Sequence, residues 1–444
     1  MDHRENNSSK KETSTTGLVR HDGTIIELLY DSAINRTAFA LCHDGDISIE
    51  DYVELGDGTR LVPYSPNNSL IKHEAVLLPS EPAAYDSEAD LILHIQSFIH
   101  RYVDLSPVFE KTALYYILLS WLYDAFNELP YIRLQGDYGT GKTRALLVLG
   151  AIAYKPFFAS GASTVSPLFH TLDAFRGTLI FDEADFRLSD EKAEVVKILN
   201  NGNVRGIPVL RTMMNQRREF NPQAFHVFGP KIVATRGSYE DRALESRFLT
   251  EVMGGQPLRP GIPINLGTSF KEEALAIRNM LLSYRFQKRH TVSLNPALRD
   301  ESLEPRQNQI LIPLLSVIDD ADQRSAIVKN AQELRQAIVS ERGLFPEAHV
   351  LTVLMELMQL KPDEAFPLKA ITELMQEKFA AEYDRPLTVR YVAHVLRKRL
   401  HLKTYKTMGN PCVPTSEAGR VLLLAERYGL RDDTEEEKSR AEGT

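Results

Sequence analysis

Cysteine is scarce in this chain of 444 residues, which contains only Cys42 and Cys412. Two cysteines so far apart exclude a disulfide framework and a cysteine-rich zinc site, and they are typical of a reducing cytoplasm. No run of about 18 apolar residues occurs, so no membrane span is predicted. The polar start of the chain also lacks the apolar core of a signal peptide. We therefore expect a cytoplasmic protein without a membrane partner.

Positive charge is also in deficit. The formal net charge is −8, while the hydrophobic content of 43% and the charged content of 25% are ordinary for a globular protein. This balance excludes a chain that coats nucleic acid with its whole surface. Any contact with DNA must come from a local basic patch.

The most specific motif is the glycine-rich segment 136–143, which matches the phosphate-binding pattern G-x-x-x-x-G-K-[ST]. Glycine permits backbone angles that let successive N–H groups surround phosphate oxygens. Lys142 would reach the β- and γ-phosphates of ATP, and Thr143 would ligate Mg²⁺. The alternative is a chance match in a glycine-containing turn. The predicted nucleotide-binding residues are Gly136, Asp137, Tyr138, Gly139, Thr140, Gly141, Lys142 and Thr143.

The flanks of this segment favour nucleotide binding. Residues 130–135 read as a short buried strand and residues 144–153 as a helix. A strand, a glycine loop and a helix in this order place the N-terminus of the helix against an anion. The sequence therefore predicts an α/β fold with ATP bound at the loop.

A second apolar run, residues 177–183, ends in two carboxylates. Ligands of doubly wound sheets lie at the carboxyl ends of the strands. Asp182 would hold Mg²⁺ beside Thr143, and Glu183 would orient and deprotonate the attacking water. The alternative is a strand that ends at a solvated acidic turn.

A third apolar strand is predicted at residues 230–235, and residues 243–248 read A-L-E-S-R-F. With these motifs the chain resembles ATPases of the extended AAA+ group, in which a sensor strand precedes a segment close to A-L-x-S-R-F. The resemblance implies that Thr235 is the sensor residue. It also implies that Arg247 is an arginine finger in the ATP site of a neighbouring subunit, with Arg242 as the second candidate. An ion pair of Arg247 with Glu245 or Glu251 is the alternative.

The short interval between the two nucleotide motifs also resembles superfamily III helicases and primase-helicase ATPases of viruses, plasmids and other mobile elements. The resemblance covers about residues 105–320, and it departs at Thr235, where many such helicases carry Asn. It implies a hairpin before the sensor strand, formed here by residues 208–214 and 219–225. Arg217 and Arg218 at its tip would grip DNA phosphates. An ordinary surface hairpin is the alternative.

The sequence divides into six segments. In the AAA+ group an arginine of the helical lid often senses the γ-phosphate. The resemblance therefore implies that Arg306 or Arg278 has this role here. A solvated helix face is the alternative for both. The expected segments are a disordered tail (1–16), a β-rich module (17–84), the ATPase core with its N-terminal helices (85–255), the helical lid and connector (256–343), a winged helix-turn-helix (344–430) and an acidic tail (431–444).

The winged helix is predicted from three helices and a two-stranded wing over residues 402–413. Residues 385–406 contain seven Lys or Arg and no acid. A recognition helix could enter the major groove while the wing contacts phosphates. A solvated helix face or a protein-docking module is the alternative. The predicted DNA-binding residues of this segment are Arg390, Arg397, Lys398, Arg399, Lys403 and Lys406.

Together these motifs predict a Mg²⁺-dependent ATPase that acts on DNA, as a ring-forming helicase or translocase of a mobile genetic element. The ATP site would be shared between subunits of a homo-oligomer. The alternative is an ATP-switched DNA-binding regulator, such as a replication initiator, a loader or a defence switch, that does not unwind DNA. A metabolic kinase would leave Arg247 and the basic C-terminal segment without a role.

Overall fold

A computed structural model describes residues 11–430, apart from 162, 183–189, 215–219, 240, 256, 343, 344, 363, 384 and 408. The chain forms two compact units, one up to Val328 and one from Lys329 onward. The division falls inside helix α10 (Ala321–Arg342). The predicted β-rich module and the ATPase core therefore belong to one unit. No described helix is both long and apolar enough to span a bilayer.

The first unit is built on a five-stranded sheet in the order β14-β8-β13-β10-β9, and all neighbouring strands are parallel. Its strands are β8 (Tyr131–Gln135), β9 (Phe157–Ser160), β10 (Leu179–Asp182), β13 (Lys231–Thr235) and β14 (Phe248–Val252). The strands predicted at 130–135, 177–183 and 230–235 are β8, β10 and β13. The predicted α/β class with a parallel sheet is thereby confirmed.

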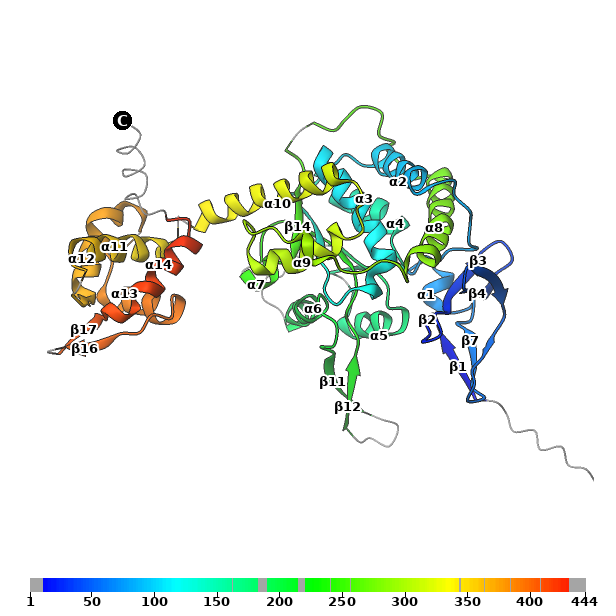
Figure 1. Cartoon of the computed structure of the whole chain (residues 1–444), viewed down its shortest axis with the longest axis horizontal. Helices are drawn as coiled ribbons and strands as arrows, with labels where there is room; N and C mark the ends of the chain where they lie inside the picture. Colours follow the sequence, from blue (N-terminus) through cyan, green and yellow to red (C-terminus); the bar gives the residue numbers. More distant parts are fainter. Residues whose placement is uncertain are drawn as a thin grey trace, which may run out of the picture. The chain divides into compact units, whose positions relative to one another are not determined.

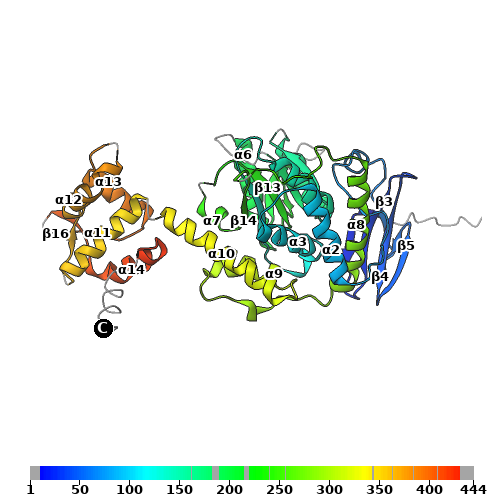
Figure 2. The same cartoon turned by 90° about the horizontal axis from the view of Figure 1, so that it is seen from above.

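Helices cover both faces of this sheet (Figures 1 and 2). Ile180 faces helix α4, where a Cβ on Gly150 would lie 3.0 Å from its side chain. Phe181 points to the other face, into a core shared with Leu168 of α5 and Ile198 of α6. Successive side chains of β10 therefore pack into two separate apolar layers, one on each face of the sheet. The helices concerned are α4 (Lys142–Ile152), α5 (Val165–Phe175) and α6 (Asp190–Asn201).

Helix α3 (Pro107–Leu122) is buried on nearly all sides. Its Tyr116 hydroxyl donates to the carbonyl oxygens of Pro130 (3.2 Å) and Lys231 (3.0 Å) and accepts from the Lys231 N–H (2.8 Å). Trp121 Nε1 donates to the Ile152 carbonyl at the end of α4 (3.0 Å). These bonds fix α3 to two strands and to the helix that follows the phosphate loop.

The helices predicted as a lid pack elsewhere. Helix α8 (Thr268–Lys288) contacts α3, α4 and α2 (Glu88–Tyr102), and α9 (Pro305–Leu315) contacts α3. Figure 2 shows α8 between these helices and the N-terminal strands. Arg278 of α8 is buried and donates to the carbonyls of Leu78 (3.2 Å) and Ala151 (2.6 Å). Helix α8 is therefore held as an internal layer of the first unit, and the helical lid stays a prediction.

Two small sheets form the N-terminal part. One has the order β2-β3-β4-β5, and the other has the order β1-β7-β6. Within the segment predicted as β-rich, strands β3 and β4 pair antiparallel. The disorder predicted over 1–16 is wrong for residues 12–15, because they form β1 and pair in parallel with β7. The bounds are β1 (Glu12–Thr15), β2 (Gly17–Val19), β3 (Ile25–Asp31), β4 (Arg36–His43), β5 (Asp46–Glu50), β6 (Val53–Glu54) and β7 (Arg60–Pro63), with α1 (Ser69–Lys72) after them.

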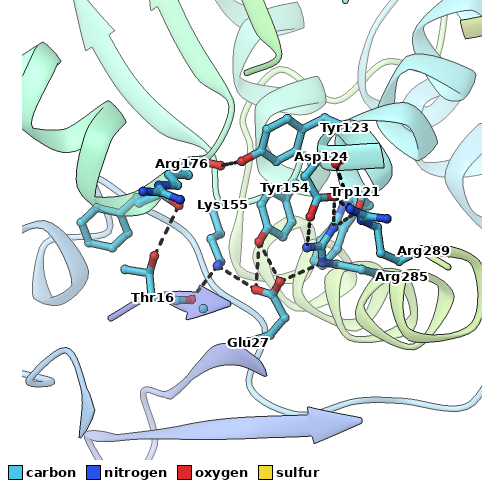
Figure 3. A network of polar contacts seen from close by, with 12 residues as sticks. Thr16, Glu27, Trp121, Tyr123, Asp124, Tyr154, Lys155, Arg176, Arg285 and Arg289 are labelled. Carbon is cyan, nitrogen blue, oxygen red and sulfur yellow. Dashed lines mark hydrogen bonds and ion pairs between the residues drawn. The ribbon is translucent and has the colours of Figure 1, made fainter. Parts of the chain in front are cut away.

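A buried ionic network joins the N-terminal strands to the core (Figure 3). Glu27 of β3 is 2% exposed, and its carboxylate accepts from Lys155 Nζ (2.7 Å) and Arg285 Nε (2.8 Å). The Tyr154 hydroxyl donates to the same carboxylate (2.8 and 2.9 Å). Arg285 also holds both oxygens of Asp124 (2.8 and 2.9 Å). One carboxylate from the first strands thus neutralises two cations from distant parts of the core.

The charges of this network depend on one another. Burial alone would raise the pKa of Asp124, but Arg285 and Arg289 hold it well below its usual range. Burial lowers the pKa of Lys155 against the opposing pull of Glu27. The network is stable only while each cation keeps its carboxylate, because an unpaired buried charge is costly.

We expect Glu27→Ala to lower the free energy of unfolding by about 3–5 kcal/mol, because it leaves Lys155 buried without its carboxylate. The matched control is Glu50→Ala, which removes an exposed carboxylate from β5 of the same sheet. Urea denaturation of both variants measures the difference. Equal stability of the two variants would contradict the prediction.

The second unit has its own apolar core. Its sheet has the order β15-β17-β16 and is antiparallel throughout. The last helix before the strands β16 and β17 is α-helical only to His394 and continues as a π-turn over Val395–Arg399. The Leu400 N–H closes this turn by donating to the Val395 carbonyl (2.9 Å). The elements are α11 (Pro346–Leu360), β15 (Phe366–Pro367), α12 (Leu368–Phe379), α13 (Val389–His394), β16 (Tyr405–Thr407), β17 (Asn410–Val413) and α14 (Ala418–Arg427).

Candidate nucleotide-binding site

The glycine loop connects β8 to α4 in a strained path that glycine alone takes readily. Gly139 and Gly141 have φ of 79° and 89°, a region that side chains disfavour. A Cβ on Gly136 would lie 2.6 Å from the carbonyl oxygen of Met253. The loop therefore enters α4 at Lys142, with the first N–H groups of the helix at the loop.

Lys142 directs its charge into the loop. Its Nζ donates to the carbonyls of Gly136 and Asp137, at 2.6 Å each. No carboxylate among the described residues pairs with it within 4.0 Å, which leaves its charge available to an anion. Thr140 Oγ1 also donates to the Asp137 carbonyl (2.9 Å), which closes the loop on itself.

Thr143 and Asp182 meet at the carboxyl edge of the sheet. Thr143 Oγ1 donates to Asp182 Oδ2 at 2.7 Å. Two oxygen ligands suit Mg²⁺, which usually keeps several waters and is bound by one or two protein groups plus phosphates. A cavity of about 380 Å³ opens here, lined by Tyr138, Gly139, Thr140, Gly141, Lys142, Thr143, Asp182, Ala234 and Arg236. The sequence-predicted loop and Asp182 thus face one space.

Thr235 ends β13, which lies between β8 and β10. Its carbonyl accepts from the Gly136 N–H (3.1 Å), so the end of this strand is tied to the start of the loop. Its buried Oγ1 has no hydrogen-bond partner among the described residues. A buried hydroxyl without a partner is costly unless a ligand or water satisfies it. Thr235 itself is absent from the cavity lining, although its neighbours Ala234 and Arg236 are part of it.

Arg236 was not predicted, yet it lines the cavity above the loop. It directly follows Thr235, and a cation at the carboxyl end of a central strand is the signal that could have pointed to it. Tyr138, 92% exposed, also lines this cavity.

Arg247 lies in the interior of its own unit and is 8% exposed. One guanidinium nitrogen donates to Asn200 Oδ1, and its Nε has no hydrogen-bond partner among the described residues. Burial and the nearby cation of Arg306 lower the pKa of Arg247. The structure therefore does not present Arg247 as an exposed finger.

The ion pair weighed for Arg247 is not formed either. Glu245 pairs instead with the buried Arg133 (2.5 Å). Glu251 accepts from the N–H (2.7 Å) and the hydroxyl (2.9 Å) of Ser106. Arg242, the second candidate finger, is the first residue of α7 (Arg242–Glu245).

The two arginines predicted in the lid are not at the loop. Arg306 lies in the first turn of α9 and is close enough to Glu128 and Arg247 to lower the pKa of each. It is absent from the cavity lining. Arg278 supports backbone carbonyls, as described above. Sequence alone could not place them, because their positions depend on which face of α8 and α9 meets α3 and α4.

Three predicted residues lie outside the described residues: Glu183, Arg217 and Arg218. The hairpin that would carry the two arginines is formed as expected by β11 (Val209–Met214) and β12 (Phe220–Phe225), paired antiparallel. It projects from the body of the first unit (Figure 1).

The basic residues of the second unit are exposed, but two are engaged. Arg399 pairs with buried Glu347 (3.4 Å), and Arg397 Nε donates to Thr404 Oγ1 (2.7 Å). Part of the charge predicted for DNA is thus used within the fold. Among the predicted DNA-binding residues of this unit, those that are exposed and have no ion pair with a described residue are Arg390, Arg397, Lys398, Lys403 and Lys406.

No protein-family model and no curated protein matches the chain. Solved structures with some likeness include an apo form of the NrS-1 C-terminal region, with a TM-score of 0.36 and 10% identity over 87% of this chain and 96% of that one. Another is described as the active helicase Cch of SCCmec type IV, with a TM-score of 0.42 and 10% identity over 92% of this chain and 80% of that one. Both TM-scores are below 0.5. The functional conclusions below therefore rest on the geometry of the site.

Proposed function

We propose that this protein is a Mg²⁺-dependent ATPase of the AAA+ type that acts on DNA. The observation that carries the proposal is the meeting of Lys142, Thr143 and Asp182 around one cavity at the N-terminus of α4. A nucleoside triphosphate with its metal ion requires a lysine charge, oxygen ligands for the metal and the N–H groups of a glycine loop.

Each side chain has a distinct task in this proposal. Lys142 would release its loop carbonyls and bind the β- and γ-phosphates. Thr143 and Asp182 would hold Mg²⁺, which supplies charge neutralisation for the phosphates. Glu183 would orient water and accept its proton. The unsatisfied hydroxyl of Thr235 would contact that water or the γ-phosphate.

Action on DNA is supported by basic groups outside the ATP site. In the second unit, helices are followed by the antiparallel strands β16 and β17, an order that supports the proposed winged helix, and the cations over residues 390–406 are exposed. We infer that it contacts duplex, and that hairpin β11–β12 contacts DNA in a ring of subunits. On this basis the protein would be a helicase or translocase of a mobile element.

The alternative is a regulator whose DNA binding is switched by ATP. Both functions need the ATP site and the basic second unit, and only the motor needs coupled movement. Mg²⁺-dependent ATP turnover, measured with and without DNA and alongside strand displacement, tests them. If DNA stimulates ATP turnover and the protein also unwinds DNA, the helicase or translocase function is supported. Turnover without unwinding supports the regulator, and no ATP binding would overturn both.

We expect the double variant Lys398→Ala and Lys406→Ala to weaken duplex binding and flatten its salt dependence. The log–log slope should fall by about 0.9 for each phosphate that is no longer neutralised. The matched control is Lys361→Ala with Lys369→Ala, which removes two exposed lysines from the same unit outside the basic segment. Filter binding over a salt series measures both. If the two double variants behave alike, the basic segment is not the duplex-binding surface.

A further inference from the structure

A second cavity, of about 530 Å³, lies in the first unit outside the nucleotide-binding site. It opens between the N-terminal strands, the end of α5, the start of the hairpin segment and α8. Six cationic side chains line it: Arg20, Lys155, Arg176, Arg205, Arg285 and Arg289. Glu27 and Asp124 are the two carboxylates in its lining.

Most of these cations are already neutralised. Lys155 and Arg285 share Glu27, and Arg289 joins Arg285 on Asp124 (Nε to Oδ1, 2.8 Å). Arg20 pairs with Asp22, just outside the lining, at 3.1 Å. These carboxylates do not balance the cavity, because its six cations face two acids in the lining and a third beyond it.

One of the three surplus charges lies in the buried network, where Lys155, Arg285 and Arg289 share two carboxylates. The other two are those of Arg176 and Arg205. Both are exposed, and neither has an ion-pair partner among the described residues. Arg205 donates to the backbone carbonyl of Asp124 (2.7 Å) and lies 5.2 Å from the ring centroid of Phe228. These contacts orient its guanidinium and leave its charge unbalanced.

Arg176 is held at the cavity wall by its backbone. It ends α5 in the left-handed region, with φ of 51°, and its N–H donates to the Leu172 carbonyl (2.9 Å). Its own carbonyl accepts from the Tyr123 hydroxyl (2.6 Å). Figure 3 shows Arg176 beside the buried network. A concave surface with unbalanced guanidinium groups attracts anions and favours phosphate, which guanidinium matches in geometry.

The position of the cavity indicates which phosphate-containing ligand it would bind. Arg205 and Gly206 precede β11, and His226 and Phe228 follow β12, so the base of the hairpin forms one wall. The exposed residues His21 and His226 extend the polar lining. Groups spread over several elements suit consecutive phosphates better than a single one. The volume is that of a small-ligand pocket, so it would admit one strand and exclude a duplex.

We propose that this cavity binds the phosphate backbone of a single DNA strand at the base of hairpin β11–β12, with Arg176 and Arg205 as its phosphate-binding residues. The inference rests on the proposed action on DNA. It adds a strand-binding site that is separate from the hairpin tip and from the second unit.

The test uses the full chain and a fluorescent oligothymidylate, with binding followed by anisotropy over a salt series. Arg176→Ala and Arg205→Ala should each weaken strand binding by about tenfold or more, as expected for a charged hydrogen bond. The log–log salt slope should fall by about 0.7 for each phosphate that is no longer neutralised. The control Arg299→Ala removes an exposed arginine outside the cavity and should leave both quantities unchanged.

Substitution by lysine distinguishes binding from folding. Arg176→Lys and Arg205→Lys keep the charge and should retain the wild-type salt slope, with melting temperatures of all variants measured beside it. Wild-type affinity and slope in both alanine variants would overturn the inference while leaving the proposed function intact. Loss of inorganic phosphate binding alone, with strand binding kept, would also overturn it. A wild-type chain that binds no DNA would refute this inference and the proposed action on DNA together.

Discussion

Lys142→Ala is expected to abolish ATP binding and to lower hydrolysis by at least about 10²-fold, the usual loss for one group that stabilises transition-state charge. The physical reason is that Lys142 is the cation that points into the loop, held by the carbonyls of Gly136 and Asp137. Alanine leaves the glycine N–H groups in place but removes the charge opposite the β- and γ-phosphates. Fluorescent ATP-analogue binding and steady-state phosphate release measure the two effects.

Two further variants make this result specific. Glu183→Gln should keep ATP binding and lower turnover by about 10²–10⁴-fold, because an amide cannot accept the proton of the attacking water. Lys72→Ala, at the exposed end of α1, removes a lysine outside the cavity and should behave as wild type. If Lys142→Ala binds ATP normally, the glycine loop is not the nucleotide site. If Glu183→Gln hydrolyses normally, another residue activates the water.

Arg247→Ala is expected to lower ATP hydrolysis by about 10³–10⁵-fold if the residue acts as an arginine finger. Its side chain is 8% exposed and contacts Asn200 within its own unit. A finger role therefore requires that Arg247 leave this contact when a neighbouring subunit assembles. The structural role predicts a different result, a lower melting temperature with the activity of each folded subunit kept.

Mixing separates these two outcomes. Arg247→Ala subunits carry intact phosphate loops, and Lys142→Ala subunits carry intact arginines, so a mixture should regain part of the activity if the site is shared. Asn200→Ala is the companion variant, because it frees Arg247 without removing it. Turnover per subunit that stays constant down to a proven monomer would contradict a shared site.

The sequence by itself determined the local chemistry of the proposed ATP site. The loop between β8 and α4 could be predicted because its conformation depends on residues that are neighbours in the sequence. Its glycines adopt φ of 79° and 89°, and a helix follows directly. The meeting of Thr143 with Asp182 followed from a general rule, that the carboxyl ends of parallel strands share one edge. Hairpin β11–β12 was also foreseen, since its strands are close in sequence.

Only the tertiary structure decided where the long-range charges lie. Arg278 and Arg285 are buried in α8, a helix that also carries exposed residues. The sequence does not show which side of α8 is buried. The burial of Arg247 and the pairing of Arg399 with Glu347 likewise depend on partners 47 and 52 residues away.

The cavity lined by Arg176 and Arg205 is the strongest case. Its walls come from β2, α5, the hairpin base and α8, segments whose sequences share no motif. The packing of apolar faces decides which side chains meet across such distances. Many different sequences are compatible with a given packing, so the sequence does not reveal these partners. The phosphate loop needed no such choice, because a short stretch of chain builds it from its own backbone.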